Sequence, residues 1–115
     1  MILRNSELIS PPVWADLART DHLARIKLDL FATSENLKTY GIVLKNGLKL
    51  LLYDEDLDDD WLIDDVIAVA IVSWAHPGLW VAEVQGGVFK HVSDLRQEEQ
   101  AAYRRFRPQI GTPLS

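Results

Sequence analysis

Eight carboxylates fall within twelve residues, from Asp54 to Asp65, in a stretch that contains no basic residue and one large aromatic, Trp61. A dense negative patch of this kind attracts cations, either a metal ion or a basic protein surface. Indole faces also attract guanidinium and ammonium groups, and a neighbouring carboxylate strengthens that attraction. Because carboxylates alone do not choose between these ligands, the sequence narrows the function to a few classes without fixing one.

Part of the stretch follows the oxygen-ligand spacing of a calcium-binding EF-hand loop. Five aspartates occupy relative positions 1, 3, 5, 7 and 12: Asp54, Asp56, Asp58, Asp60 and Asp65. Position 6 is Asp59 where the sharp turn needs glycine, position 12 lacks the usual glutamate, and the segment before the loop has the pattern of a strand. An EF-hand is therefore not expected. A domain that responds to calcium or magnesium stays an alternative, as does a solvated loop that only aids solubility.

The preferred interpretation is a surface that recognises a basic protein or peptide. We expect it to comprise a tyrosine, five aspartates and a tryptophan: Tyr53, Asp54, Asp56, Asp58, Asp59, Asp60 and Trp61. Trp61 is expected at the surface because the acids beside it must reach water. Trp74 and Trp80 are expected to end neighbouring strands and to pack on each other.

Residues suited to catalysis do not form a recognisable pattern. The chain has no cysteine, which excludes disulfides, thiolate zinc sites and cysteine nucleophiles. His22, His76 and His91 lack the spacing of a zinc pair. Asp64 and Asp65 could act as acid and base, but a small domain with one acidic loop offers little depth for a substrate. We predict a protein that is not an enzyme, with no catalytic residues, metal or cofactor, and rank a hydrolase that uses the loop carboxylates last.

Length and composition predict one domain over residues 1–115. A chain of 115 residues that is 48% hydrophobic and 25% charged has the composition of an ordinary globular protein. A pI near 5.0 argues against a nucleic-acid partner. The longest apolar run, residues 66–74, is too short to span a bilayer, and the first ten residues lack a signal-peptide core, so we expect a cytoplasmic protein without membrane contact. The sequence does not fix the oligomeric state.

Residues 10–40 are expected to form a helical segment. Ser10 is followed by two prolines, as at a helix start, and Val13, Trp14 and Leu17 supply an apolar face. A second helix would begin at Thr20-Asp21 and end at Gly41. Within it, residues 25–31 alternate between apolar and charged side chains, which would suit a strand equally well.

Residues 41–92 have a β pattern. Two glycine-containing pairs, Asn46-Gly47 and Gly86-Gly87, predict tight hairpins, the second of which would place Glu83 opposite Lys90. A long apolar strand over residues 66–74 is expected to turn through a wider loop at 75–79, so that Trp74 faces Trp80.

A final helix is expected over residues 94–107, with a loose tail after Pro108. The sum is an α+β fold: an N-terminal helical segment, a five-stranded antiparallel meander and a C-terminal helix. The meander resembles a small SH3-like or Tudor-like barrel in architecture, which by itself assigns no activity. The leading hypothesis is a non-enzymatic protein-interaction module, of which an immunity- or antitoxin-like inhibitor is one version.

Overall fold

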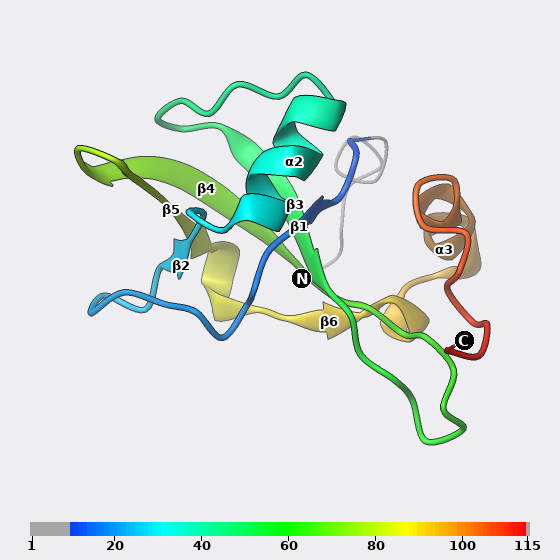
Figure 1. The fold of residues 1–115 in the computed structure, drawn as a ribbon. Helices are drawn as coiled ribbons and strands as arrows, with labels where there is room; N and C mark the ends of the chain where they lie inside the picture. Colours follow the sequence, from blue (N-terminus) through cyan, green and yellow to red (C-terminus); the bar gives the residue numbers. More distant parts are fainter. Residues whose placement is uncertain (1–9, 115) are drawn as a thin grey trace.

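The computed structural model describes residues 10–114, which form a curled mixed sheet with a helix on each side (Figure 1). Its elements, in chain order, are β1 (Val13–Trp14), β2 (Ile26–Lys27), α2 (Phe31–Thr39), β3 (Lys49–Asp54), β4 (Val66–His76), β5 (Leu79–Val84), η1 (Gln85–Gly87), β6 (Lys90–His91), η2 (Val92–Asp94) and α3 (Gln97–Arg104). The α+β class and the small, curled sheet are confirmed.

The strand order is not that of a meander. It runs β1-β3-β4-β5-β2, with β6 pairing to the free part of β4 beside β5. β1 lies parallel to β3, whereas the other pairs are antiparallel. The predicted five-stranded antiparallel meander is therefore wrong, because the two strands that close the edges come from the N-terminal segment that was expected to be helical.

The sheet is buried on both faces, which explains the unbroken apolar run of β3. Leu50 and Leu52 lie in one core cluster with Leu37 of α2. Leu51 and Tyr53 point the other way, into a second cluster with Tyr103 of α3. Successive residues of a strand alternate between faces, so a strand between two cores has no polar face to show in its sequence.

The predicted first helix is wrong, and a short strand takes its place. Val13 and Ala15 are fully buried on the α2 side of the sheet, while Trp14 packs against the other cluster. This is the period of a strand, and it is too short to be separated from a helical pattern by sequence alone. The backbone N–H of Trp14 donates to Asn36 Oδ1 at 2.8 Å, which fixes β1 against α2.

The predicted second helix is right only from Phe31 to Thr39. Asp21 does not cap a helix: its Oδ1 accepts from the backbone N–H groups of Leu23 and Arg25, both at 2.9 Å, and turns the chain back. Aspartate favours such turns because its side chain competes with the helix for backbone donors. The strand alternative for residues 25–31 is thus correct at Ile26–Lys27, which pair with β5.

Neither predicted glycine hairpin forms. Residues 42–44 are not a strand. Asn46 Oδ1 instead accepts from the N–H of Trp74, and Gly47 donates to Val72 O, so this turn covers the edge of β4. The chain leaves Gly86-Gly87 for β4 rather than returning along β5. Glu83 accordingly lies opposite Ile71 and Lys90 opposite Ile67, so the predicted Glu83–Lys90 pair is wrong.

The turn between β4 and β5 is tighter than predicted. His76 pairs with Leu79, and a bulge between Trp74 and His76 allows Pro77 and Gly78 alone to reverse the chain. A bulge supplies the extra twist that an ordinary turn lacks in a tight hairpin. The predicted Trp74–Trp80 pair is confirmed, with ring centroids 4.7 Å apart in an edge-to-face arrangement.

The C-terminal helix is shorter than predicted and the tail is ordered. A 3-10 turn occupies residues 92–94, and α3 ends at Arg104, before Pro108. Ile110 is buried, and Gly111 N–H donates to Ile63 O while Ile63 N–H donates to Thr112 O. The expectation of a loose tail is wrong because it packs against the acidic stretch.

Candidate functional site

The acidic stretch between β3 and β4 folds back on itself as a hairpin, which projects below the sheet (Figure 1). Leu57 and Ile63 form a bridge, Asp64 N–H donates to Asp56 O at 2.9 Å, and Asp58 N–H donates to Leu62 O at 2.9 Å. We call residues 56–64 the acidic hairpin. Backbone pairing, supported on one side by the C-terminal tail, therefore replaces the open loop that the charge density suggested.

The tip of the acidic hairpin holds Trp61 in the solvent. Asp58 Oδ1 accepts from the N–H groups of Asp60 and Leu62 at 2.8 and 3.0 Å, and the N–H of Trp61 donates to Asp58 O at 3.0 Å. These bonds fix Trp61 at φ 63°, in the left-handed region that few non-glycine residues occupy. Its side chain is 74% exposed. The expectation that Trp61 lies at the surface is confirmed.

The last two acids of the stretch are buried and serve the fold. Asp64 accepts from the N–H and the hydroxyl of Ser93, at 3.0 and 2.6 Å. Asp65, which is 0% exposed, receives two bonds from the Arg107 guanidinium, at 2.9 and 3.1 Å, and one from the Tyr103 hydroxyl at 2.7 Å. Both carboxylates are thus occupied in tying β4 to the C-terminal segment.

Burial and charge shift two pKa values in this network. Burial raises the pKa of the Tyr103 phenol, and the neighbouring Asp65 carboxylate raises it further. Burial acts to lower the pKa of Arg107, but its bonds to Asp65 outweigh that effect and raise it. Both shifts favour the protonated forms, so Tyr103 is neutral and Arg107 is charged near neutral pH, and neither of the two exchanges a proton there.

Two residues assigned to the surface from the sequence are held by the fold. Tyr53 is 8% exposed, and the Arg107 guanidinium lies over its ring at 4.3 Å. Asp54 accepts from the N–H of Leu17 at 3.3 Å and of Glu55 at 3.0 Å. The structure therefore separates both residues from the exposed tip, where Asp58, Asp59 and Asp60 lie around Trp61.

Asp56 is exposed and paired with His91 of β6. His91 Nε2 lies 2.8 Å from Asp56 Oδ2, and both side chains are about half exposed. The hydrogen bond that His91 makes to the Asp56 carboxylate raises the pKa of His91 and lowers the pKa of Asp56. The pair joins the base of the acidic hairpin to the neighbouring strand.

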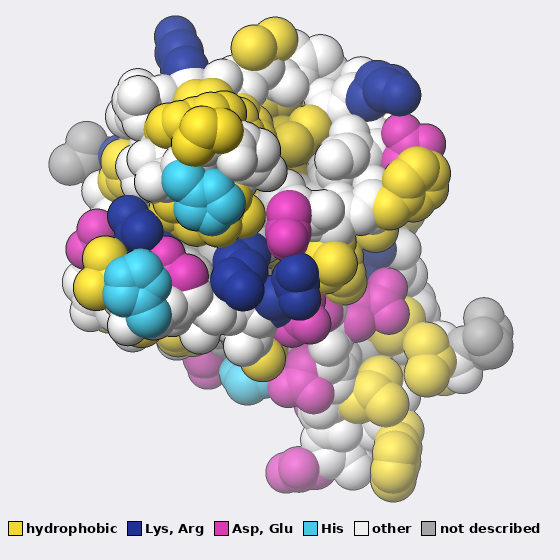
Figure 2. All heavy atoms as spheres, turned by 60° about the vertical axis from the view of Figure 1, so that its left-hand side comes forward, with side chains coloured by type: hydrophobic (Ala, Val, Ile, Leu, Met, Phe, Trp, Pro, Cys, Tyr) yellow, Lys and Arg dark blue, Asp and Glu magenta, His cyan; other side chains and the backbone are white. Residues whose placement is uncertain are grey.

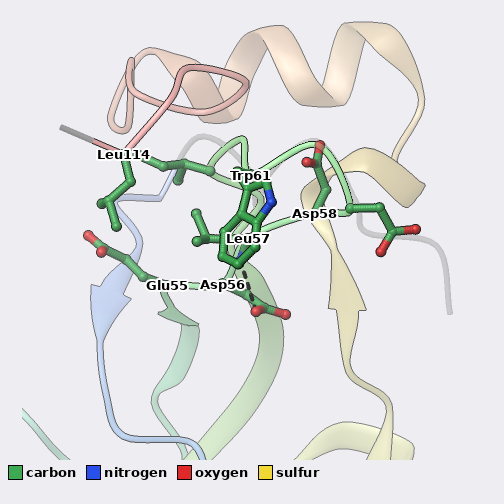
Figure 3. Close-up of a pocket in the computed structure, with 8 residues that line it drawn as sticks. Glu55, Asp56, Leu57, Asp58, Trp61 and Leu114 are labelled. Atoms are coloured by element: carbon green, nitrogen blue, oxygen red, sulfur yellow. Dashed lines mark hydrogen bonds between the residues drawn. The ribbon is translucent and has the colours of Figure 1, made fainter.

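An open hollow of about 650 Å³ lies beside Trp61 (Figure 3). Besides the indole, three apolar side chains line it: Leu57, Ile63 and Leu114. Four carboxylates complete it: Glu55, Asp56, Asp58 and Asp59. In the close-up, Glu55 and Leu114 lie on one side of the indole and Asp58 on the other. The hollow therefore combines an apolar surface with a negative border.

Sequence reasoning missed three apolar members of this site. Leu57 and Ile63 face the hollow because they form the bridged pair of the acidic hairpin. Leu114 reaches it because Leu62 bridges to Pro113. Leu57 and Ile63 are apolar residues on either side of the acidic tip, which could have indicated a hairpin. No local signal links Leu114 to residues about fifty positions earlier.

The carboxylates of the acidic hairpin do not converge on one point. Within residues 10–114, no group of three acidic or histidine side chains is placed to hold a metal ion. Asp58 uses one oxygen in the turn, Asp56 faces His91, and Asp64 faces Ser93. The arrangement is suited to contacts along an extended cationic surface, since the charges are spread over the hairpin.

Comparison of the chain with protein-family models, with curated proteins and with solved structures gave no match. In the described part of the chain, no helix is long and apolar enough to cross a membrane.

Proposed function

We propose that this protein is a non-enzymatic interaction module that binds a basic protein or peptide through the acidic hairpin. The observation that carries the proposal is the position of Trp61, which is 74% exposed between aspartates at the tip of a fixed turn. A large aromatic in the solvent contributes nothing to the core. Surrounded by carboxylates, it is suited to contact with guanidinium or ammonium groups.

The distribution of charge supports the same proposal. Asp58, Asp59 and Asp60 are exposed on a projecting element that contains no basic residue. Charges in this position speed encounter with an oppositely charged partner and orient it before contact. The structural use of Asp64 and Asp65 supports a role other than hydrolysis, because neither carboxylate is free to act on a substrate.

An inhibitor of a cationic protein, of the immunity or antitoxin kind, is one concrete version of this proposal. Such a protein needs a rigid complementary surface and fast association rather than catalytic groups. The finer expectations belong to the same proposal: a small barrel similar to SH3-like or Tudor-like domains, which bind basic or proline-rich peptides, and a cytoplasmic location.

The test is capture of partners from a lysate of the source organism by three tagged proteins. These are the wild type, an Asp58→Asn/Asp59→Asn/Asp60→Asn variant, and a control that removes the same charge from three distant acids that are exposed or half-buried, Glu35→Gln/Glu83→Gln/Glu98→Gln. We expect one basic partner to be retained by the wild type and the control but lost from the hairpin variant. Its affinity, measured with the purified partner, should fall steeply between low and high salt.

Equal capture by the hairpin variant, or an affinity that salt does not change, would refute the proposal. Each capture is repeated with a chelator. Loss of the partner on chelation would favour the alternative of a calcium- or magnesium-responsive domain, because a direct contact between the hairpin and a basic surface needs no metal ion.

A further inference from the structure

The hollow beside Trp61 has the features of a site for one side chain rather than for a flat surface. Its volume of about 650 Å³ falls within the range of sites that hold small ligands. Leu57 and Ile63 supply an apolar wall from the acidic hairpin, and Leu114 supplies another from the C-terminal tail. These residues would contact a hydrocarbon chain, whereas the bordering carboxylates require that its end be positive.

The carboxylates around the hollow differ in how much of their capacity is used. Glu55 accepts from Arg107 at 3.2 Å, and Asp56 faces His91. Asp58 uses Oδ1 in the turn. Within residues 10–114, Asp59 has no hydrogen-bond or ion-pair partner. Asp58 and Asp59 are therefore the acceptors best able to receive new donors, and both line the hollow together with Trp61.

We infer that this hollow binds an arginine side chain of the basic partner, an inference that rests on the proposed function. Its aliphatic stem would lie against Leu57 and Leu114, and its guanidinium would stack on the exposed face of Trp61. The planar group presents N–H donors at its edge while its face covers the ring, so Asp58 and Asp59 could accept from it at the same time. Charge complementarity and the flat, exposed indole both favour this occupant.

Lysine fits the same hollow less well. Its ammonium is compact and strongly hydrated, and an open hollow leaves it in contact with water. It has no planar face to stack, so contact with Trp61 would cost it hydration that guanidinium loses more readily. An uncharged aliphatic side chain would meet the apolar wall but leave the carboxylates without donors. The hollow should therefore rank arginine above lysine, and both above a neutral chain.

The test is an NMR titration of the isotope-labelled 115-residue protein with three small probes: N-acetyl-argininamide, N-acetyl-lysinamide and N-acetyl-norleucinamide. We expect the arginine probe to shift the Trp61 indole N–H and the methyl signals of Leu57, Ile63 and Leu114. Its affinity should be roughly threefold to fivefold higher than that of the lysine probe, the range expected for stacking at an exposed site. The neutral probe should shift none of these signals.

Two variants locate the contact. Trp61→Leu should reduce the affinities for arginine and lysine to similar values, and Asp59→Asn should weaken both. Trp74→Leu is the matched control, because Trp74 is also exposed, at 45%, but lies on β4 away from the hollow. Backbone amide spectra of each variant show whether the fold is retained.

The outcomes separate this inference from the function on which it rests. Equal affinity for the arginine and lysine probes, or shifts confined to residues outside the hollow, would overturn the inference while leaving charge-driven binding of a basic partner intact. Capture of the partner that does not depend on Asp58, Asp59 and Asp60 would instead refute the proposed function itself. Arginine preference that disappears in Trp61→Leu supports both.

Discussion

Trp61 combines a solvent-exposed side chain with a backbone conformation that disfavours any side chain. At φ 63° its Cβ crowds the following carbonyl, which costs an L-residue roughly 1–2 kcal/mol relative to glycine. Glycine has no Cβ and would satisfy the same turn, which the Asp58 carboxylate already closes. A residue that is costly for the fold and unused by the core is what the proposed contact with a partner would require.

Trp61→Gly is therefore expected to be more stable than Trp61→Ala by about 0.5–1 kcal/mol, since both lose the indole and only alanine keeps the strain. Urea unfolding followed by the remaining tryptophans measures the difference. Ala32→Gly, at an exposed position of α2, is the matched control and should destabilise by about 1 kcal/mol. An alanine variant as stable as the glycine variant would mean that the left-handed turn is not retained in solution.

Two aspartates of the same stretch have opposite roles. Asp65→Asn removes the charge that Arg107 faces in the interior, and breaking a buried pair in this way is expected to cost about 3 kcal/mol of unfolding free energy. Asp60→Asn, at the exposed tip, should change it by less than about 0.5 kcal/mol. Chemical denaturation of both variants compares them directly. Similar losses for the two would contradict the division between buried and exposed acids.

The sequence could indicate the exposed tryptophan but not this division. Trp61 is flanked by charges that must be solvated, and that local argument was sufficient to place it. Asp64 and Asp65 belong to the same acidic stretch, yet their environment is decided by Ser93, Tyr103 and Arg107, about thirty to forty residues away. Partners so distant along the chain leave no local pattern, and a run of acids gives no sign of which members have a partner.

At the scale of elements, the pair between Asp56 and His91 connects the acidic hairpin to β6. The folded state raises the pKa of His91 above 6.5, so its contribution to stability is fully present below that value and is lost as pH rises through the folded pKa. The stabilisation by Asp56 has the opposite pH dependence. Because its pKa is lowered, this contribution is present above pH 3.8 and is lost as pH falls through the folded pKa. The Asp56–His91 pair therefore stabilises the fold most between pH 3.8 and pH 6.5.

His91→Gln should consequently lose more stability at about pH 5.5 than at about pH 8.5, by an amount under about 1 kcal/mol, because both side chains are half exposed. Denaturant unfolding of wild type and variant across this range gives the difference, in which the contributions of the other histidines cancel. Asp56→Asn should show the same pH trend. A destabilisation that grows above pH 8 would contradict the assignment of the pair.

The C-terminal tail is a structural element although it is neither helix nor strand. Ile110 is 6% exposed in the core beside α3, and the next two residues, Gly111 and Thr112, form backbone hydrogen bonds with Ile63. Ile110→Ala is expected to cost about 2–4 kcal/mol of unfolding free energy, as for other buried isoleucines. Leu114→Ala is the control: this side chain is 61% exposed, so its loss should change stability by less than about 0.5 kcal/mol. Equal losses would mean that the tail is not packed.

Elements with strong local patterns were predictable, whereas their partners were not. The apolar runs of β3 and β4 and the Trp74–Trp80 pair could be read from the sequence, because each depends on neighbouring residues or on one short connection. Val13–Trp14 and Ile26–Lys27 are strands of two residues whose identity comes from the sheet they join. Glycine pairs indicated turns correctly, but which strand receives the chain afterwards is decided by the core.

At the scale of the whole molecule, negative charge is concentrated on one projection. Figure 2 shows acidic and hydrophobic side chains together on the part that extends below the body, while Lys and Arg side chains lie on the body above it. The stretch from Asp54 to Asp65 carries eight of the seventeen acids, and the remainder of the chain holds 12 bases. A molecule polarised in this way would approach a basic partner with the acidic hairpin first.

The same concentration of charge should oppose folding. Asp58, Asp59 and Asp60 are adjacent like charges, and their repulsion is not relieved by any base of the hairpin. Asn at position 58 retains a carbonyl oxygen that can accept from Asp60 and Leu62, so the turn does not require the charge. The acids at the tip are thus expected to reduce stability slightly in exchange for binding, as is common at functional sites.

Asp58→Asn/Asp59→Asn/Asp60→Asn should therefore be as stable as the wild type or more stable, by up to about 1 kcal/mol at low ionic strength, with a gain that shrinks as salt screens the repulsion. Denaturant unfolding at low and high salt measures it. The Glu35→Gln/Glu83→Gln/Glu98→Gln control removes the same charge from separated positions, two of which pair with Lys38 and Arg96, so at low salt it should lose a little stability rather than gain it. A hairpin variant clearly less stable than the wild type would show that the aspartates shape the turn, and its loss of a partner would then reflect a disordered hairpin rather than a missing contact.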